Sequence, residues 1–240
     1  MTGRLVGLLG SGEYLPWAAE VDRWLLDRAS VGDGSVALLA TAAAPEGDAM
    51  FDKWSNMGLE HYRTMGVPAK VVPLKTREDA SREAILSGID TASLVFFSGG
   101  NPAYLASTLR ETPFWKRLME RVDEGAAVAG CSAGACLFGE VAPDPTKMGS
   151  PGEAFAPAGL AVFPGFAFGA HWDVLDSYYP DLRGLSIRSM PPGCRMVGID
   201  ENTAMAADDG TWTVFGAGGV HVYRSDEAIT YTAGQTFTLP

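Results

Sequence analysis

The chain has 240 residues, of which 47% are hydrophobic and 20% charged, a composition typical of one soluble globular domain that spans residues 1–240. Its formal net charge is −11 without any basic cluster, which argues against nucleic acid or an anionic membrane surface as a partner. No apolar run has the length of a membrane span, and the three cysteines lack a C-x-x-C pattern, which favours a cytoplasmic protein with reduced thiols and without a metal or cofactor.

In the first part of the chain, short apolar runs alternate with segments of helical periodicity. The apolar runs predict strands at 4–9, 35–41, 69–74, 93–97 and 126–129. The segments between and after them predict helices at 17–29, 48–65, 77–86, from Pro102 onward, 114–123 and 133–138. This alternation predicts a three-layer, doubly wound α/β fold with a mostly parallel sheet.

The pattern changes after these elements. Residues 139–158 are rich in proline and glycine and read as a surface loop that could cover a site. Residues 165–171 read as a second turn-rich segment, and 177–190 as a helix interrupted by Pro180. Short runs then predict antiparallel strands appended to the main sheet, at 195–199, 203–207, 211–215, 219–224, 228–232 and 235–239.

The stretch from Gly130 to Gly134 reads Gly-Cys-Ser-Ala-Gly and lies between a predicted strand and a predicted helix. This is the pattern of a nucleophile elbow, a tight turn that raises the Ser132 hydroxyl above the sheet. A five-residue match also arises by chance, and small residues serve ordinary strand–helix packing. Its position after a strand, near two other polar turns at 10–13 and 98–101, favours the functional interpretation, because parallel strands place their carboxyl ends at one edge.

A serine nucleophile needs a base, and the chain offers three histidines. His61 lies in the middle of a predicted helix, and His221 alternates with apolar residues on a predicted strand. His171 follows a strand in a glycine-rich loop and is therefore the better candidate.

A carboxylate must orient the base, and an oxyanion site needs two N–H donors. The carboxylate candidates are Asp173, Asp176, Asp200 and Glu201, and spacing does not choose among them. One donor would be the N–H of Ala133, which follows the serine. The second would come from the glycine pair 99–100, which could equally be a plain strand–helix turn.

Four segments together resemble one family: Leu9-Gly10-Ser11-Gly12-Glu13, Phe97-Ser98-Gly99-Gly100-Asn101, Gly130-Cys131-Ser132-Ala133-Gly134-Ala135 and Gly198-Ile199-Asp200-Glu201-Asn202-Thr203-Ala204. The family is that of cyanophycinase and dipeptidase E, serine peptidases with a fold similar to class I glutamine amidotransferases. The resemblance covers nearly the whole chain.

The resemblance implies a role for each of several residues. It implies Ser132 as nucleophile, His171 as general base, Glu201 as the third member, and the N–H groups of Gly100 and Ala133 as the oxyanion hole. Serine replaces the cysteine of the amidotransferases, so Cys131 becomes a packing residue. Three residues that adjoin these groups are expected to contact the substrate: Asn101, Trp172 and Asp173.

The sequence departs from the family at the positions that would hold an acidic substrate. Pro102 stands where cyanophycinases carry a glutamine, and Leu175 and Ser177 stand where they carry arginines, although Arg183 or Arg188 could replace those. The expected function is therefore hydrolysis of a small peptide or related amide of unknown side chain. A homodimer is compatible with the sequence.

Two other functions remain open. An esterase of the α/β-hydrolase type would use Ser132, Asp200 or Glu201, and His221, but the chain lacks a His-Gly-Gly-Gly segment. A catalytically inactive relative that binds a ligand would explain the missing arginines.

Overall fold

The computed structural model describes residues 3–224 and 227–239. Its strands are β1 (Leu5–Leu9), β2 (Val36–Leu39), β3 (Ala69–Val71), β4 (Leu94–Phe97), β5 (Ala127–Cys131), β6 (Phe166–Gly169), β7 (Arg195–Ile199), β8 (Thr203–Asp208), β9 (Thr211–Gly216), β10 (Gly219–Arg224), β11 (Glu227–Thr232) and β12 (Thr236–Thr238). Its α-helices are α1 (Ala18–Arg28), α2 (Asp48–Met65), α3 (Glu83–Leu86), α4 (Pro102–Leu109), α5 (Pro113–Glu124), α6 (Ala133–Cys136), α7 (Pro151–Ala154), α8 (Leu175–Tyr178) and α9 (Leu182–Arg188).

The large sheet has eight strands in the order β12-β9-β8-β1-β5-β4-β2-β3. The strands β1, β5, β4, β2 and β3 are mutually parallel, and β8, β9 and β12 extend the sheet in antiparallel fashion next to β1. The predicted α/β fold with a mostly parallel sheet is therefore confirmed.

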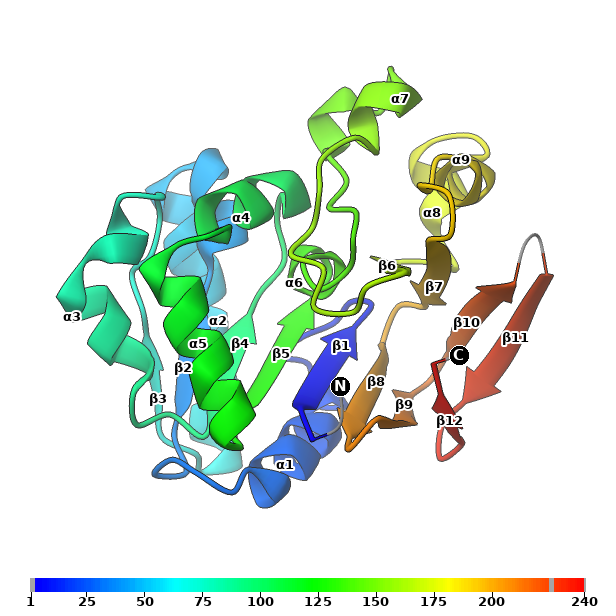
Figure 1. Cartoon of the computed structure of the whole chain (residues 1–240). Helices are drawn as coiled ribbons and strands as arrows, with labels where there is room; N and C mark the ends of the chain where they lie inside the picture. Colours follow the sequence, from blue (N-terminus) through cyan, green and yellow to red (C-terminus); the bar gives the residue numbers. More distant parts are fainter. Residues whose placement is uncertain (1–2, 225–226, 240) are drawn as a thin grey trace.

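Helices cover both faces of this sheet (Figure 1). Alternate side chains of β1 enter different cores: Val6 and Leu8 join the cluster with helices α4 and α5, whereas Leu5 and Leu9 join the cluster with helices α1 and α2. The central strands are buried along their whole length. This two-sided burial explains why their sequences are continuous apolar runs rather than alternating ones.

Three of the predicted C-terminal strands do not join the main sheet, which corrects the expectation. The strands β7, β10 and β11 form a second, four-stranded sheet in the order β11-β10-β7-β6. Its fourth member, β6, lies within the segment 165–171 that the sequence suggested was turn-rich, and it pairs in parallel with β7. The chain leaves this sheet after β7 and returns to the large sheet at β8 (Figure 1).

Two further expectations are corrected at the level of helices and loops. The predicted helix 77–86 is broken: Asp79–Ser81 is a 3-10 turn, Arg82 is extended with φ −82° and ψ 129°, and only Glu83–Leu86 is α-helical. The segment 139–158 is not wholly a surface loop: Val141, Ala142, Ala154 and Phe155 are buried. The break at Pro180 is confirmed, since α8 and α9 lie on either side of it.

Within residues 3–224 and 227–239, none of the helices combines the length and the apolar character that a membrane span requires.

Candidate active site

The turn between β5 and α6 holds Ser132 in a strained conformation. Its backbone has φ 53° and ψ −112°, values that a non-glycine residue rarely adopts. The turn closes because Gly130 and Gly134 lack side chains: a Cβ on Gly130 would lie 2.2 Å from the Gly134 carbonyl oxygen. Packing keeps Ser132 in this conformation, together with a hydrogen bond that the Ser132 N–H donates to the Leu9 carbonyl at 2.9 Å.

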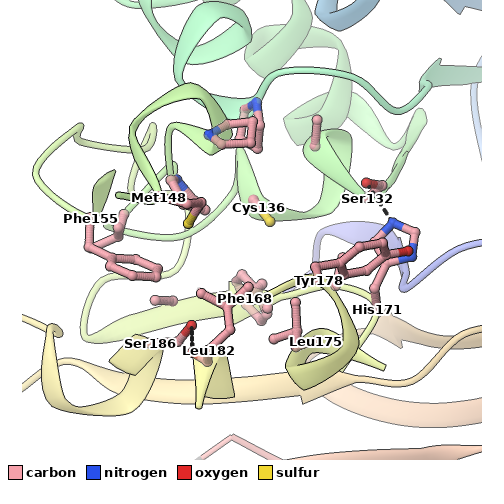
Figure 2. Close-up of a pocket in the computed structure, with 18 of the residues that line it drawn as sticks. Ser132, Cys136, Met148, Phe155, Phe168, His171, Leu175, Tyr178, Leu182 and Ser186 are labelled. Carbon is pink, nitrogen blue, oxygen red and sulfur yellow. Dashed lines mark hydrogen bonds between the residues drawn. The ribbon is translucent and has the colours of Figure 1, made fainter. Parts of the chain in front are cut away.

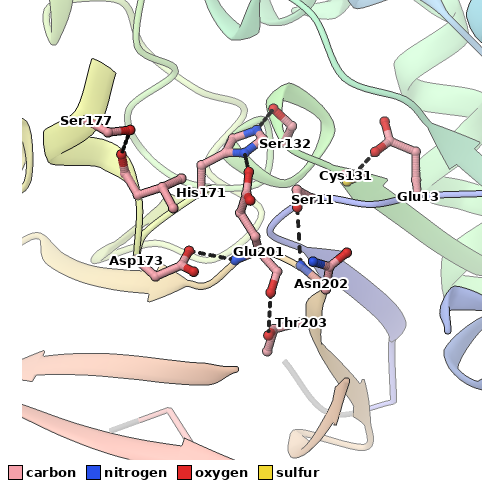
Figure 3. Close-up of polar contacts among 11 residues, drawn as sticks. Ser11, Glu13, Cys131, Ser132, His171, Asp173, Ser177, Glu201, Asn202 and Thr203 are labelled. Carbon is pink, nitrogen blue, oxygen red and sulfur yellow. Dashed lines mark hydrogen bonds and ion pairs between the residues drawn. The ribbon is translucent and has the colours of Figure 1, made fainter. Parts of the chain in front are cut away.

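Ser132, His171 and Glu201 form a continuous hydrogen-bonded chain (Figure 3). The Oγ of Ser132 lies 3.0 Å from Nε2 of His171, and Nδ1 of His171 lies 2.9 Å from Oε1 of Glu201. With the ring proton on Nδ1 donated to the carboxylate, Nε2 accepts from the serine hydroxyl. The His171 and Glu201 side chains are 29% and 34% exposed, so solvent and a small molecule can reach them.

Polar contacts fix the turns that carry the base and the acid. His171 follows β6 with φ 52°. Glu201 lies in the connection between β7 and β8, where its N–H donates to the Asp173 carboxylate at 2.8 Å and its carbonyl accepts from the Thr203 hydroxyl at 3.0 Å. The base and the acid are thus joined twice, once directly and once through Asp173.

The end of β1 anchors all three members of this chain. Leu9 accepts from Ser132, and the Gly10 carbonyl accepts from the His171 N–H at 3.3 Å. The Gly10 N–H donates to the carbonyl of Thr203, just beyond Glu201, at 2.9 Å. Gly10 must be glycine here, since a Cβ would lie 2.1 Å from the Asp200 carbonyl oxygen. The end of β1 and the glycine-rich turn after it therefore hold the backbones of all three segments in place.

Two backbone N–H groups beside Ser132 are suited to hold an oxyanion. The N–H groups of Gly100 and Ala133 have no acceptor within the described part of the chain, and both residues line the cavity at Ser132. The Gly99 N–H is unsuitable, because it donates to Oε1 of Glu13 at 3.0 Å. Of the two glycines that the spacing left open, Gly100 is thus the one whose N–H has no acceptor in the described chain, and its φ of 142° requires glycine.

Glu13 connects the oxyanion turn with the elbow. Its carboxylate is buried and accepts both the Gly99 N–H and the Cys131 thiol, the latter at 2.9 Å (Figure 3). Burial raises the pKa of the Cys131 thiol well above its ordinary value, and the negative Glu13 raises it further. Cys131 is therefore a protonated packing residue and hydrogen-bond donor.

The other two histidines are paired away from Ser132. His61 lies 2.8 Å from the buried carboxylate of Asp22, and His221 lies 2.9 Å from that of Asp200. The nucleophile–acid–base arrangement expected of an α/β-hydrolase esterase thus lacks its base, since the His221 ring nitrogens bind Asp200 and Thr230.

The three residues expected to contact substrate have other positions. Asn101 caps α4, with its Oδ1 accepting the Tyr104 N–H at 3.0 Å. Trp172 is 1% exposed and packs beneath the site, where its indole N–H donates to Tyr223. Asp173 binds the Glu201 backbone. None of the three is among the described residues that line the cavity at Ser132, and their contact with substrate stays a prediction.

A cavity of about 400 Å³ opens beside Ser132 and His171 (Figure 2). Its floor is β6, one wall is the segment 141–155, and the opposite wall is formed by α8 and α9. From the sequence, residues 139–158 read as a surface loop that could cover a site, and their part in the wall of a cavity was not predicted. The apolar residues scattered among its prolines, Val141, Met148 and Phe155, were the available signal.

Within the described residues, no three histidine, cysteine or acidic side chains are grouped closely enough to hold a metal ion. The groups gathered at Ser132 are its hydroxyl, the imidazole of His171, the carboxylate of Glu201 and the N–H groups of Gly100 and Ala133.

The chain is similar in sequence to several known proteins. The model of peptidase family S51 matches residues 6–215. A cyanophycinase from Synechococcus elongatus is 30% identical over 236 residues, which are 95% of this chain and 70% of the cyanophycinase. A cyanophycinase from Trichormus variabilis is 25% identical over 244 residues, or 96% of this chain and 76% of its own.

The chain is also similar to solved structures. The crystal structure of a peptidase from an acI-B1 Actinobacterium superposes with a TM-score of 0.90 and 29% identity, covering 99% of this chain and 98% of that one. A putative peptidase E protein from Listeria monocytogenes shares the fold, with a TM-score of 0.64 and 14% identity over 90% of this chain and 99% of its own.

Proposed function

Because the chain belongs to peptidase family S51, we propose that it is a serine-type peptidase that hydrolyses small peptides or related amides through Ser132, His171 and Glu201. The observation that carries the proposal is the hydrogen-bonded chain from Ser132 Oγ through His171 to Glu201. It ends at a cavity beside two N–H groups that have no acceptor in the described chain.

In the first half of the proposed reaction, His171 Nε2 takes the proton as Ser132 Oγ attacks the scissile carbonyl carbon. The Glu201 carboxylate stabilises the imidazolium that results. The carbonyl oxygen becomes negative and accepts hydrogen bonds from the N–H groups of Gly100 and Ala133. When the C–N bond breaks, the imidazolium returns its proton to the departing amine, leaving an ester on Ser132.

In the second half, a water molecule replaces the amine. His171 accepts a proton from the water as its oxygen attacks the ester carbon, and the oxyanion forms again at the same two donors. Collapse breaks the ester bond, and the proton returns from His171 to Ser132 Oγ. The products are a carboxylic acid and an amine, and the site returns to its initial protonation state.

The test is a dipeptide screen with α-aspartyl, β-aspartyl and neutral first residues, run on the wild type and on Ser132→Ala. Loss of the nucleophile should lower kcat by at least about 10⁴-fold. In parallel, a fluorophosphonate should label the wild type once, and intact mass spectrometry should find no label on Ser132→Ala.

Ser107→Ala is a matched control, because Ser107 is exposed on α4 and its hydroxyl donates to the Tyr104 carbonyl. It should be labelled like the wild type. A folded wild type that neither cleaves any dipeptide nor reacts with the fluorophosphonate would contradict the proposal and favour a ligand-binding protein without catalysis.

A further inference from the structure

The cavity beside Ser132 has an almost wholly apolar wall (Figure 2). Phe168 lies on its floor, Met148 and Phe155 come from the segment 141–155, and Leu175 and Leu182 come from α8 and α9. These side chains come from four separate elements and meet around one space. The cavity volume, about 400 Å³, lies within the range of small-molecule sites.

The wall also lacks charge. No aspartate, glutamate, lysine or arginine is among the described residues that line the cavity. The arginines of the adjoining α9 are engaged elsewhere: Arg183 donates to Asp176 at 2.8 Å, and Arg188 donates to Asp181 at 2.6 Å. The hydroxyl of Ser186, which faces the cavity, donates to the Leu182 carbonyl at 2.7 Å.

Asp144, which lies between the cavity-lining Pro143 and Pro145, is likewise satisfied locally. Asp144 accepts the N–H of Thr146 at 3.0 Å and its hydroxyl at 2.7 Å. These bonds hold the pKa of Asp144 below its ordinary value. A charged substrate side chain in the cavity would therefore lose its hydration without gaining a counter-ion.

From this wall we propose that the cavity is the side-chain pocket of the substrate, and that it selects a bulky, uncharged, apolar side chain next to the scissile bond. The proposal rests on the proposed function, because it assumes that the bond is broken at Ser132. Apolar side chains gain from burial in proportion to the area removed from water, whereas a carboxylate or guanidinium is penalised there. The enzyme would accordingly differ in substrate from a peptidase that recognises acidic residues.

The experiment compares side chains of nearly equal shape. Leucine, asparagine and aspartate share the same branched skeleton, so dipeptides X–Gly and Gly–X with these residues at X separate polarity from size. We expect kcat/KM for leucine to exceed that for aspartate by on the order of 100-fold in one of the two orders, with asparagine in between. Aspartate or arginine substrates cleaved as fast as leucine and methionine in both orders would overturn the proposal.

A pair of variants tests the wall itself. Met148 is partly exposed, so Met148→Lys can extend its ammonium toward water and fold, while Met148→Leu keeps the wall apolar. The lysine should lower kcat/KM for the leucine substrate about tenfold. The ratio of kcat/KM between the leucine and aspartate substrates should also decrease, because the lysine supplies a counter-ion for the aspartate. The leucine variant should keep the preference for the leucine substrate over the aspartate substrate, because its wall stays apolar. Equal behaviour of both folded variants would count against the pocket.

Binding to Ser132→Ala separates failure of the pocket from failure of the proposed function. N-acetyl-leucinamide should shift the NMR signals of this variant at concentrations at least about tenfold lower than N-acetyl-aspartate amide. Selective leucinamide binding without hydrolysis by the wild type would leave the pocket standing and reject the peptidase. Ser132-dependent hydrolysis with a preference for aspartate would keep the peptidase and reject the pocket.

Discussion

At the scale of single residues, the structure contains two similar histidine–carboxylate pairs, and they differ in the hydroxyl group that the histidine contacts. His171 with Glu201 and His221 with Asp200 are both histidine–carboxylate contacts of 2.9 Å, and the carboxylates are neighbours in sequence. His171 binds the Ser132 hydroxyl, whereas His221 binds Thr230. The second pair is therefore an internal control for the first.

The first prediction uses this control. Glu201→Gln should lower kcat by about 10²–10⁴-fold, because a neutral amide neither stabilises the imidazolium nor fixes the correct tautomer. Asp200→Asn should leave kcat within about threefold of the wild type, while it lowers the free energy of unfolding by about 1–3 kcal/mol, since buried Asp200 also accepts the Gly219 N–H. Steady-state kinetics and urea denaturation check both. An equal loss of kcat in the two variants would contradict the assignment of the acid.

The second prediction concerns the thiols beside the serine. Burial raises the pKa of Cys136 to about 11 and that of Cys131 well above its ordinary value. An acid with a raised pKa keeps its proton, so at pH 7.5 fewer than about one Cys136 thiol in a thousand is the reactive thiolate. Iodoacetamide at pH 7.5 should leave activity unchanged, and Cys136 should become reactive only as the pH approaches 11. Rapid inactivation at pH 7.5 that Cys131→Ala prevents would mean that a cysteine takes part.

From its residues alone, the sequence predicts Ser132 as the nucleophile but leaves four carboxylates open as the acid. The elbow can be predicted from a local pattern because the turn is too tight for side chains at Gly130 and Gly134: a Cβ on Gly130 would lie 2.2 Å from the Gly134 carbonyl oxygen. Four carboxylates near His171 and Ser132 in the fold have no such local signature. Asp173, Asp176 and Asp200 are satisfied by the Glu201 N–H, Arg183 and His221, respectively, and these partners cannot be read from spacing. Here the resemblance to a family, rather than the pattern, singled out Glu201.

At the scale of elements, the turn after β1 and the turn after β4 are joined by one side chain. Glu13 accepts the Gly99 N–H and thereby fixes the peptide that leads to the Gly100 N–H. We infer that Glu13 is a positioning residue for the oxyanion donors.

The third prediction follows from this contact. Glu13→Ala should lower kcat about 10–100-fold with KM within about threefold, because the oxyanion develops after substrate has bound. Glu13→Gln retains an oxygen that can accept the Gly99 N–H, so it should recover most of kcat. A change confined to KM, or no recovery with glutamine, would argue against this role.

The fourth prediction concerns the docking of α5. Arg117 on α5 donates two hydrogen bonds to Asp90, which precedes β4, and these bonds lower the pKa of the Asp90 carboxyl. A lowered folded-state pKa means that the stabilisation is complete above the ordinary pKa of 3.8 and is lost as the pH falls through the folded value. Both side chains are about one-third exposed, so the coupling is modest.

A double-mutant cycle of Asp90→Asn and Arg117→Met should give a coupling energy of about 0.5–1 kcal/mol at pH 7, read from urea midpoints. The coupling should decrease as the pH falls below the ordinary pKa of 3.8 and through the lower pKa of the folded state, where the carboxyl becomes protonated. A coupling that does not decrease at any pH below 3.8 would contradict the assignment of the ionised form.

Whether a segment forms a helix or a strand was easier to predict from the sequence than the strands with which it pairs. Continuous apolar runs predicted the buried parallel strands, and Gly66 ends α2 in the left-handed conformation expected of a C-cap. The segments 195–199 and 203–207 have similar local patterns, yet β7 and β8 belong to different sheets. Partner choice depends on tertiary contacts such as the approach of Gly10 to Asp200, which no local pattern records.

For the molecule as a whole, the site lies where the two sheets meet. Ser132 follows β5 of the large sheet, His171 follows β6 of the small sheet, and Glu201 lies on the crossing from β7 to β8. The catalytic distances therefore depend on how one sheet is held against the other. Neither sheet alone contains a serine with its base.

The fifth prediction is that activity and tertiary structure are lost together. In increasing urea, activity should disappear no later than the first transition in the near-ultraviolet circular dichroism of the tryptophans, because separation of the sheets removes His171 from Ser132. Buried Trp172 of the small sheet and Trp212 of β9 report on the two regions. Activity that persists after either signal has changed would show that one sheet suffices.

The position of β1 has a consequence for the chain as it is being made. β1 pairs with β5 and with β8. Leu9 and Gly10 can therefore contact β8, their last partner in chain order, only after some 190 further residues have left the ribosome. The elbow at Ser132 can form with β1 and β5 while His171 and Glu201 have yet to be synthesised. A nascent chain at that stage carries a nucleophile without a base. We therefore expect the ribosome-bound chain to be inert toward amides until residues 171–201 have emerged and His171 and Glu201 can contact Ser132.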